Sequence, residues 1–496
     1  MKIENAAGRM IEEKISGNEI RPFSGAKKYS YESKVTTLSD ALRKCGLKDG
    51  VTLSFHHQLR EGDHIINITL GAVRDLGVKN IRVAQTAMFN VNEPVIDFIK
   101  DGVVNRIEGS INGVVGDYIS KNPLPFPVVL RSHGGRWGAI RSNELHIDIA
   151  IITASASDEY GNCSGVIGKH AFGPICYSQI DAQKADKVIV VTDNLVEYPC
   201  AFQEIEEGSV DFVVEVKNIG DPEKIVSGTT KITENPMKQG IAHSCVDLMD
   251  AAGIIKNGMK YQSGAGAISL AVTKYLGEEM EEKNIVGNFA IGGITKHLID
   301  IYENGRFKKL YFGQCFDYHS AKYLSEHAGI PILNVGHYAD PFACSRAVDK
   351  LDTVVLGGTE VDLNFNVNVN THSDGRMLHG IGGHQDTATG ASLTIITVPV
   401  YRKTNPIIRE KVTNITTPGS VVDAIVTNEG IAINPNRNDL IDKIKGKVDL
   451  VSIENLKDMA YEATGGPQEI EFTDEIVGII KWFDGTILDV IRKVKM

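Results

Sequence analysis

Residues 147–158 read Ile-Asp-Ile-Ala-Ile-Ile-Thr-Ala-Ser-Ala-Ser-Asp, and residues 351–362 read Leu-Asp-Thr-Val-Val-Leu-Gly-Gly-Thr-Glu-Val-Asp. Both segments place an apolar run between two aspartates, and Asp148 aligns with Asp352 at a spacing of 204 residues. A second pair of segments shares a pattern at almost the same spacing: 95–107 and 298–310. Two independent segments that agree on the spacing indicate an internal duplication.

Around these segments, short β-branched runs alternate with amphipathic stretches. Runs of this kind are typical of buried strands in parallel sheets, and the stretches between them predict covering helices. Strands are expected at 51–55, 80–85, 146–154, 186–193, 211–216, 310–314, 352–358, 392–400 and 423–428, and helices at 63–77, 93–102 and 237–253. We therefore predict an α/β protein of two similar open-sheet domains related by pseudo-twofold symmetry. The boundary is expected near Asn235-Pro236, which gives the domains 1–235 and 236–496.

The composition narrows the class of protein. The chain has 496 residues, 42% of them hydrophobic, so it is long enough for two compact units with ample cores. The net charge of −11 removes the electrostatic driving force for nucleic-acid or anionic-membrane binding. The seven cysteines are scattered, without the spacing of a disulfide framework or zinc site. Because no signal-peptide core or apolar run of about 20 residues is present, we expect a cytoplasmic enzyme without a bound metal.

Ligands of open α/β sheets bind beyond the carboxyl ends of the strands, where this chain has unusual loops. The first predicted strand is followed by His56, His57 and Arg60, which suit a carboxylate-rich ligand. Its counterpart in the second half is rich in glycine and precedes a helix, so its backbone N–H groups suit an oxyanion. The residues concerned are Gly264, Gly266 and Ala267. The alternative for the histidine loop is an ordinary solvated turn.

Three further glycine-rich clusters follow apolar runs. Glycines let the backbone close on a small anion, and an arginine beside them can bind it through two hydrogen bonds. The clusters are His133-Gly134-Gly135-Arg136, Gly292-Gly293 and Gly382-Gly383-His384 with Asp386. Each alone is equally compatible with a tight turn, but equivalent positions in both halves favour a glycine-lined cleft.

Two polar segments are interpreted as structural. The alternating asparagines of 364–370 place amides along one face of an extended segment, and we expect them to cross-link the domain. Glu360 lies beside Asp362, which repeats Asp158, so we assign it to the scaffold. No GxSxG, HExxH, Walker or GxGxxG motif is present, which argues against serine hydrolases, zinc proteases, P-loop ATPases and NAD enzymes.

An ordered set of motifs resembles the α subunits of bacterial citrate lyase over nearly the whole chain. The motifs are VTLSFHHQLREGD, SHGGR, IDIAIITASASDEYGN, YQSGAGAISLAVTKYL, FAIGGIT, EVDLNFNVNV, GIGGHQDTATGASL and VTNEGIAINPNR. DEYGN and GGHQD followed by VTNEGIA are also similar to the coenzyme A transferase and acetyl-CoA hydrolase superfamily, whose fold is a duplicated α/β pair. Each motif is moderately specific, and their order is highly specific.

The resemblance implies a transferase that converts acetyl-S-acyl carrier protein and citrate into citryl-S-acyl carrier protein and acetate. It also implies a β subunit that cleaves the citryl thioester, with magnesium expected for that partner. The γ subunit would be an acyl carrier protein bearing a dephospho-coenzyme A derivative, with acetyl-CoA as a surrogate. No cofactor is expected to be bound covalently to this chain, and self-association is expected.

The chain departs from its relatives at one position. Related transferases carry a catalytic glutamate in a loop that corresponds to about Gly292, where this chain has no carboxylate. We therefore predict that a citrate carboxylate attacks the acetyl thioester directly, and that the missing side chain leaves room for it. Candidate oxyanion donors are the N–H groups of Gly264, Gly266, Ala267, Gly292 and Gly293.

The substrate trianion needs cations and hydrogen-bond donors around it. We expect them to be His56, His57, Arg60, His133, Gly134, Gly135 and Arg136, supported by Gly382, Gly383, His384 and Asp386. Rival interpretations are a citramalate lyase α subunit, a coenzyme A transferase or thioesterase of the same fold, and a noncatalytic assembly subunit. They differ in which acceptor, if any, takes the acyl group.

Overall fold

The computed structural model describes residues 2–4, 9–12, 32–225, 232–264, 266–327 and 329–495. The chain divides into two compact units, Met1–Ser33 and Lys34–Met496. In the first, β1 (Lys2–Glu4) pairs antiparallel with β2 (Met10–Glu12). The second, called the main unit below, contains two large sheets.

The first sheet has ten strands, and its central strands are parallel. Helices cover its faces, so β8 is buried over its whole length, as its unbroken apolar run predicts. In spatial order the strands are β27 (Ile487–Val494), β26 (Phe472–Lys481), β7 (Val128–Leu130), β6 (Val104–Ile111), β5 (Ile81–Met88), β4 (Thr52–Phe55), β8 (Ile149–Ala154), β11 (Lys187–Thr192), β13 (Phe212–Glu215) and β3 (Val35–Thr36).

The second sheet has seven strands and repeats the order of the first. It is parallel except at its last pair. In spatial order the strands are β16 (Phe307–Cys315), β15 (Gly287–Ile294), β14 (Lys260–Ser263), β17 (Thr353–Gly357), β20 (Thr394–Thr397), β24 (Ala424–Thr427) and β25 (Gly430–Ile433). The series β6-β5-β4-β8-β11-β13 thus corresponds to β16-β15-β14-β17-β20-β24, and the predicted duplication is confirmed.

The paired aspartates of the repeat do the same work in each half. Asp148 accepts a hydrogen bond from the N–H of Thr52 at 2.7 Å, and Asp352 accepts one from the N–H of Lys260 at 2.8 Å. Each bond joins the start of one central strand to the start of its neighbour, since Thr52 begins β4 and Lys260 begins β14. The duplication therefore extends to individual side-chain contacts.

The second aligned pair shapes the turns that follow the central strands. Asp158 accepts from the backbone N–H and side-chain amide of Asn162, at 3.1 and 2.8 Å. Asp362 accepts from the corresponding groups of Asn366, at 3.0 and 3.1 Å. These turns belong to two small three-stranded sheets, β10 (Cys163–Ser164)-β9 (Ala156–Asp158)-β12 (Leu195–Val196) and β19 (Val367–Asn368)-β18 (Glu360–Asp362)-β23 (Ile408–Arg409). A two-stranded pair completes the strands: β21 (Tyr401–Arg402) and β22 (Asn405–Pro406).

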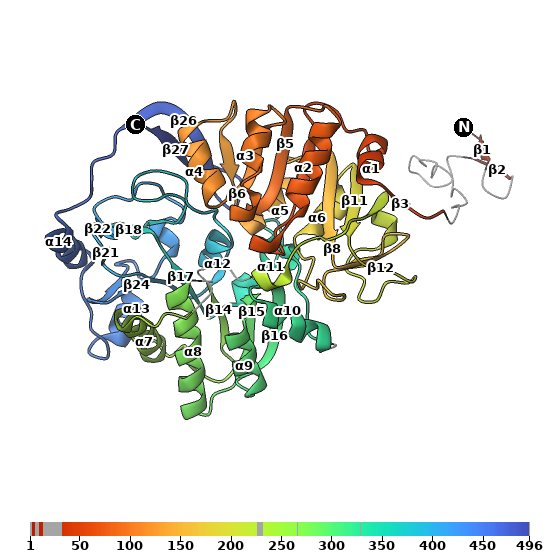
Figure 1. Ribbon diagram of the computed structural model, residues 1–496. Coiled ribbons are helices and arrows are strands. Elements are labelled where there is room, and N and C mark those ends of the chain that lie inside the picture. Colours follow the sequence, from red (N-terminus) through yellow and green to blue (C-terminus); the bar gives the residue numbers. More distant parts are fainter. Residues whose placement is uncertain are drawn as a thin grey trace. The chain divides into compact units, whose positions relative to one another are not determined.

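Helices connect the parallel strands, as alternating β and α segments require. Figure 1 shows α2, α3 and α4 beside the first sheet and α8 and α9 beside the second. The helices of the first part are α1 (Leu38–Lys44), α2 (Ile65–Asp75), α3 (Val95–Lys100), α4 (Val114–Lys121), α5 (His133–Arg141) and α6 (Ser178–Lys184). Those of the second are α7 (Pro236–Ala251), α8 (Ala267–Glu282), α9 (Lys296–Glu303), α10 (Tyr318–Glu326), α11 (Val335–Ala339), α12 (His384–Gly390), α13 (Asn438–Ile444) and α14 (Ile453–Thr464).

The C-terminal hairpin crosses the predicted domain boundary. β26 pairs in parallel with β7, so the last strands of the chain extend the sheet of its first part. Helix α7 begins next to the predicted boundary, with Asn235 as its N-cap. Residues 226–231, which precede this boundary, lie outside the described residues. The division of the chain at residue 235 stays a prediction.

Candidate active site

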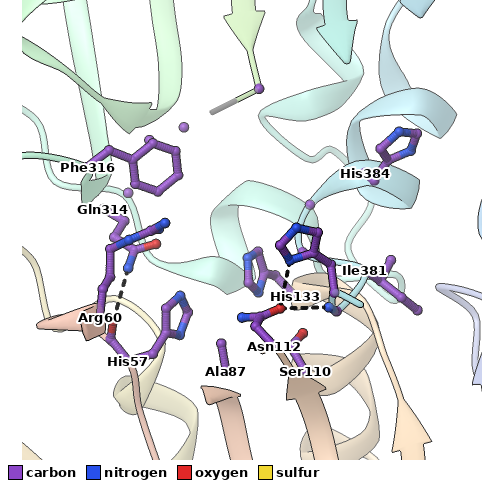
Figure 2. Close-up of a pocket in the computed structure, with 18 of the residues that line it drawn as sticks. His57, Arg60, Ala87, Ser110, Asn112, His133, Gln314, Phe316, Ile381 and His384 are labelled. Atoms are coloured by element: carbon purple, nitrogen blue, oxygen red, sulfur yellow. Dashed lines mark hydrogen bonds between the residues drawn. The ribbon is translucent and has the colours of Figure 1, made fainter. Parts of the chain in front are cut away.

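A cavity of about 580 Å³ lies where the carboxyl ends of the parallel strands of both sheets face each other. β4, β5 and β6 contribute His57, Ala87 and Ser110 from the first half, close to where those strands end. β14, β15 and β16 contribute Gln262, Gly293 and Gln314 from the second half. Figure 2 shows the first-half residues on one side and Gln314 and Phe316 on the other. The carboxyl ends of the repeated strands, together with the loops that follow them, therefore line the cavity.

Arg60 lies on a short 3₁₀ helix (Arg60–Gly62) after β4 and carries the cation of the cavity. Its guanidinium lies 5.0 Å from the ring centroid of Phe89 and 4.9 Å from that of Phe316, so one aromatic ring comes from each half. Its backbone φ of 53° lies in the left-handed region, which residues other than glycine rarely adopt. Burial lowers the pKa of Arg60 to about 10, which leaves it charged at neutral pH.

His57, His133 and Tyr177 form a ring cluster in the cavity wall. The His57 and His133 rings are stacked with centroids 5.9 Å apart, and Tyr177 lies 5.0 and 4.8 Å from them. The Tyr177 hydroxyl donates to Gln314 Oε1 at 3.1 Å, and Gln314 Nε2 donates to the carbonyl of His57 at 3.4 Å. Gln314 thereby joins the second sheet to the histidine wall of the first.

His57 and His133 in the cavity wall are neutral at pH 7. Burial, Arg136 and Arg60 lower the pKa of His133 to about 4. Burial, His133 and Arg60 hold the pKa of His57 well below its usual value. His57 Nδ1 lies 2.5 Å from Thr86 Oγ1, which holds the ring in place. The two histidines therefore offer a ligand neutral ring nitrogens, and Arg60 offers the charge.

In the second half, Gln262 lies against the backbone of Gly292. Gly292 has a φ of 105°, and a Cβ there would lie 2.9 Å from the Gln262 side chain. The expected room for substrate at residue 292 is therefore taken by Gln262. A Cβ on Gly293 would lie 1.9 Å from the Phe316 ring, so glycine here lets this ring approach Arg60.

The loop 378–383 of the second half closes the cavity against the first. Asn112 Oδ1 accepts from the N–H of Gly380 at 3.1 Å and lies 3.2 Å from His379 Nδ1. The N–H of His133 donates to the carbonyl of Gly382 at 3.0 Å. A Cβ on Gly380 would lie 1.8 Å from Ser110 Oγ, so only glycine permits this approach. The predicted Gly382 and Gly383 line the cavity as part of this closing segment.

Arg136 and His56 lie beneath the cavity rather than in its wall. The Arg136 guanidinium donates to both carboxylate oxygens of Asp181, at 2.9 and 3.1 Å, and to Ser54 Oγ at 2.7 Å. His56 Nε2 lies 3.6 Å from Asp181, and burial lowers the pKa of His56 to about 4. The pair thus forms a buried cluster with Asp181 outside the lining of the cavity, and its expected role in substrate binding stays a prediction.

Asp386 connects the two halves at the start of helix α5. Its carboxylate accepts from Ser132 Oγ at 2.7 Å and from the N–H of Gly134 at 3.0 Å. Ser132 caps the helix by accepting from the N–H of Gly135 at 2.9 Å. Gly134 and Gly135 are therefore helix residues that position His133, and not ligand contacts. Burial raises the pKa of Asp386 to about 6.

The predicted oxyanion donors differ in whether their backbone N–H groups are already hydrogen-bonded within the protein. Gly264 donates its N–H to the carbonyl of Val355 at 2.8 Å, so this group is used inside the turn after β14. Gly266 lines the cavity as the N-cap of α8, and Ala267 is the first residue of that helix. No side chain among the described residues caps this helix start. Gly266 and Ala267 remain predictions as donors, together with Gly292 and Gly293.

Among the described residues, Glu61 is the carboxylate that lines the cavity. It accepts from the N–H of Val91 at 3.2 Å and from Asn90 Nδ2 at 3.1 Å. His384 lines the cavity too, but its Nδ1 lies 2.7 Å from Thr417 Oγ1 and its Nε2 lies 3.0 Å from the Gly357 carbonyl. Both side chains are thus held by neighbouring loops.

The asparagines of 364–370 and Glu360 make contacts within the protein, as expected of structural residues. Asn368 Nδ2 donates to Glu360, and Asn370 Nδ2 donates to the carbonyl of His379. Glu360 is fully buried and paired with Arg409 at 2.7 Å. Sequence reasoning did not name five residues that line the cavity: Gln262, Gln314, Tyr177, Tyr338 and Phe316.

One group of described residues outside the cavity could offer three ligand atoms to a metal ion: His146, Asp148 and Asp186, within 4.8 Å of one another. It lies at the amino ends of β8 and β11, opposite the edge that carries the cavity. His146 Nε2 lies 3.0 Å from Asp186, and Asp148 also accepts from Thr52, so ion pairing and strand capping account for the group.

Two parallel α/β sheets related by duplication, with a cavity between their carboxyl edges, define the coenzyme A transferase-like class. The α subunit of Acinetobacter baumannii malonate decarboxylase shares this fold, with a TM-score of 0.63 and 15% identity over 88% of each chain. No helix in the described part of the chain is long and apolar enough to cross a membrane.

Closer similarity defines the family. Residues 32–494 match the family "Citrate lyase, alpha subunit (CitF)", and the chain belongs to it. The citrate lyase α chain of Haemophilus influenzae is 40% identical over 93% of this chain and 92% of its own, and that of Escherichia coli K12 is 38% identical over 96% and 95%. A Streptococcus mutans citrate lyase α subunit, solved in complex with citrate, is 41% identical with a TM-score of 0.91, over 97% of this chain and 93% of its own.

Proposed function

We propose that this chain is the acyl-exchange subunit of a citrate lyase, converting an acetyl thioester of an acyl carrier and citrate into a citryl thioester and acetate. The observation that carries the proposal is the cavity between the sheets, where one clamped arginine and two neutral histidines face a tricarboxylate-sized space. The crystal structure of the 41% identical relative in complex with citrate supports the same ligand.

The proposed reaction uses a citrate carboxylate as nucleophile. One carboxylate oxygen bonds to the acetyl carbonyl carbon, the C–S bond breaks, and the carrier thiolate leaves with the electron pair. The product is an acetyl-citryl anhydride. The thiolate then attacks the citryl carbonyl carbon, and acetate leaves with the bridging oxygen. No proton transfer is needed, because the attacking carboxylate is ionised at neutral pH.

The lining of the cavity supports this path over an acyl-enzyme. Glu61, the lining carboxylate among the described residues, is hydrogen-bonded to Val91 and Asn90. Residue 292 is a glycine packed against Gln262. Arg60 would hold a second carboxylate of citrate, and the His57 and His133 rings would contact the remaining oxygens. Alignment of the bound citrate with the thioester would then supply much of the rate enhancement, up to about 7–11 kcal/mol when near ideal.

The reaction implies two partners and one prosthetic group. The acyl carrier would be the γ subunit, whose dephospho-coenzyme A-type arm enters the cavity, and the β subunit would cleave the citryl thioester. The volume of about 580 Å³ supports simultaneous occupation by citrate and the end of a thioester arm. With a net charge of −11 on this chain, docking of an acidic carrier would need a local basic surface.

The test is a single turnover with acetyl-CoA and citrate labelled with ¹⁸O in its carboxylates. Mass spectrometry should detect citryl-CoA, and the acetate released should carry one ¹⁸O. In the same reaction, hydroxylamine should leave every glutamate unmodified. Unlabelled acetate, or a hydroxamate on a glutamate, would contradict direct attack by citrate.

The choice of acceptor separates the rival functions. Equal rates with citramalate would favour a citramalate lyase subunit, and transfer to acetate, succinate or water would favour a coenzyme A transferase or thioesterase. Absence of any citryl thioester, whether citryl-CoA from acetyl-CoA or citryl carrier from the acetylated carrier, would favour a noncatalytic assembly subunit.

A further inference from the structure

Gln262 has a different environment from its counterpart in the first half. The sheet registers pair Gln262 with Val354 and Ser54 with Ala150, so the two residues occupy the same position of the repeat. Ser54 is fully buried, and its hydroxyl bonds to Asp181 and Arg136. At the same position the second half carries a longer amide that reaches the cavity wall.

One end of the Gln262 amide is bonded and the other is not. Nε2 lies 2.7 Å from the Tyr338 hydroxyl, whereas Oε1 is buried without a hydrogen-bond partner among the described residues. The side chain is only 8% exposed, and an unsatisfied buried polar atom is costly. An amide left half-satisfied in a cavity wall indicates a ligand that completes its hydrogen bonds.

Gln262 lines the cavity, and the two ends of its amide can exchange places. A rotation of 180° about its terminal bond exchanges two groups of nearly equal size. In the rotated form, the Tyr338 O–H donates to Oε1, and the NH₂ group takes the place of the atom without a partner. Burial and the nearby Asp386 raise the pKa of Tyr338, so its hydroxyl keeps the proton that this bond needs.

The ligands of the proposed function select the rotated form. Citrate carboxylates and a thioester carbonyl are rich in acceptors, so an N–H donor fits them and a second acceptor does not. We propose that Gln262 is a catalytic residue whose side-chain N–H donates to the acyl oxygen that becomes negative when citrate attacks the thioester. The assignment rests on the proposed function, and Tyr338 acts as a positioning residue that orients the amide.

The activity test compares Gln262→Met with Gln262→Glu. Methionine keeps the length of the side chain without a donor, so kcat should fall about 100- to 1000-fold while the KM for citrate changes little. In Q262E the ionised carboxylate cannot donate but the neutral acid can. The activity of Q262E relative to the wild type should therefore rise as the pH falls, which a purely structural role would not produce.

Tyr261→Phe is the matched control. Tyr261 precedes Gln262 on β14, is fully buried and shares a 3.0 Å hydrogen bond with Thr273 outside the cavity. Its loss should lower stability and leave kcat within about twofold, as expected when no contact to the reacting atoms is removed.

A binding measurement makes the assignment independent of turnover. The infrared carbonyl band of ¹³C-labelled acetyl-CoA bound to the full chain should lie at lower frequency in the wild type than in Gln262→Met. An unchanged band, or a kcat of Gln262→Met within about threefold of the wild type, would overturn the role of Gln262. If the wild type makes no citryl-CoA, the proposed function fails, and the band still decides whether Gln262 contacts the thioester.

Discussion

Arg60 and Arg136 show what decides the role of a residue in this protein. Both follow glycine- or histidine-rich motifs and both are buried, with 8% and 6% of their surfaces exposed. Arg136 is paired with Asp181. Burial raises the pKa of Asp181, but Arg136 and His56 lower it by more, so this pKa lies below its usual value. Arg60 is clamped by the rings of Phe89 and Phe316 and lines the cavity. The arginine that pairs with a carboxylate thus lies outside the cavity lining, whereas the arginine that packs between two aromatic rings lines the cavity.

Arg60→Met should weaken citrate binding selectively. Methionine retains an apolar side chain between the two rings but removes the charge. One charge-assisted hydrogen bond is worth about 1.5–3 kcal/mol, so the KM for citrate should rise about 10- to 100-fold. The KM for acetyl-CoA should change much less, and steady-state kinetics with each substrate varied in turn would measure both.

Arg106→Met is the control for Arg60. The Arg106 guanidinium lies 3.5 Å from the Phe126 ring centroid, so it also stacks on phenylalanine, but it lies outside the cavity. This variant should keep both KM values. Equal increases in the two KM values of Arg60→Met would show that Arg60 does not act on citrate in particular.

At this scale the sequence predicted the chemistry of the loops better than their contacts. His57, Arg60 and His133 were expected to face an anion, and they line the cavity. The pairing of Arg136 with Asp181 joins residues 45 positions apart, which no local pattern reveals. Gln262 was not identified as a site residue, although it lies in the motif YQSGAG, because the glycines of that motif drew attention to backbone N–H groups and not to side chains.

Among the elements, the C-terminal hairpin contacts both halves of the repeat. β26 extends the first sheet beside β7, yet the hairpin also accepts hydrogen bonds from second-half residues. Asn414 Nδ2 donates to the carbonyl of Val490 at 2.9 Å, and Gln385 Nε2 donates to that of Lys481 at 3.1 Å. The hairpin therefore holds the two halves together away from the cavity.

Ile491→Ala should destabilise the main unit. Ile491 on β27 is fully buried, and truncating a buried isoleucine to alanine costs about 2–5 kcal/mol. Urea unfolding followed by circular dichroism should show the loss as one shifted transition. Ile487→Ala on the same strand is the control, because Ile487 is 61% exposed and its truncation should cost little. Similar midpoints for the two variants would mean that the hairpin does not belong to the folded core.

The strands and helices of the repeat were predictable because each has a local signature. Apolar β-branched runs gave β8 and β17, and the amphipathic stretch after β4 gave α2. The place of the hairpin was not predictable, because the pairing of β26 with β7 joins segments about 350 residues apart. Local patterns determine what a segment becomes, but not its neighbours in a sheet.

At the scale of the whole molecule, the net negative charge opposes the binding of an anionic substrate. A chain with a net charge of −11 binds an anion in a cavity where His57 and His133 are neutral. A bound anion favours the protonated imidazole and raises its pKa. Proton uptake would therefore accompany binding and reduce the electrostatic cost.

Citrate binding should take up protons, and its affinity should rise as the pH falls towards 6. Without citrate the pKa of His133 is about 4. A bound anion raises this pKa, so between the lower and the higher value the complex binds more protons than the free protein does. Titration calorimetry in two buffers of different ionisation enthalpy measures the uptake. His133→Gln should reduce it, and subtracting that variant removes the contribution of citrate itself. Identical uptake in the two proteins would contradict protonation of His133.

The long separation of β26 from β7 along the chain also matters during synthesis. A ribosome completes β7 hundreds of residues before it makes the strand that lies beside it. Until then the earliest sheet has an open edge, the kind of surface on which nascent chains aggregate or are bound by chaperones. Both repeated halves must be made before this edge of the first sheet is covered, so a premature stop near residue 470 would release a chain with both halves made and that edge still bare.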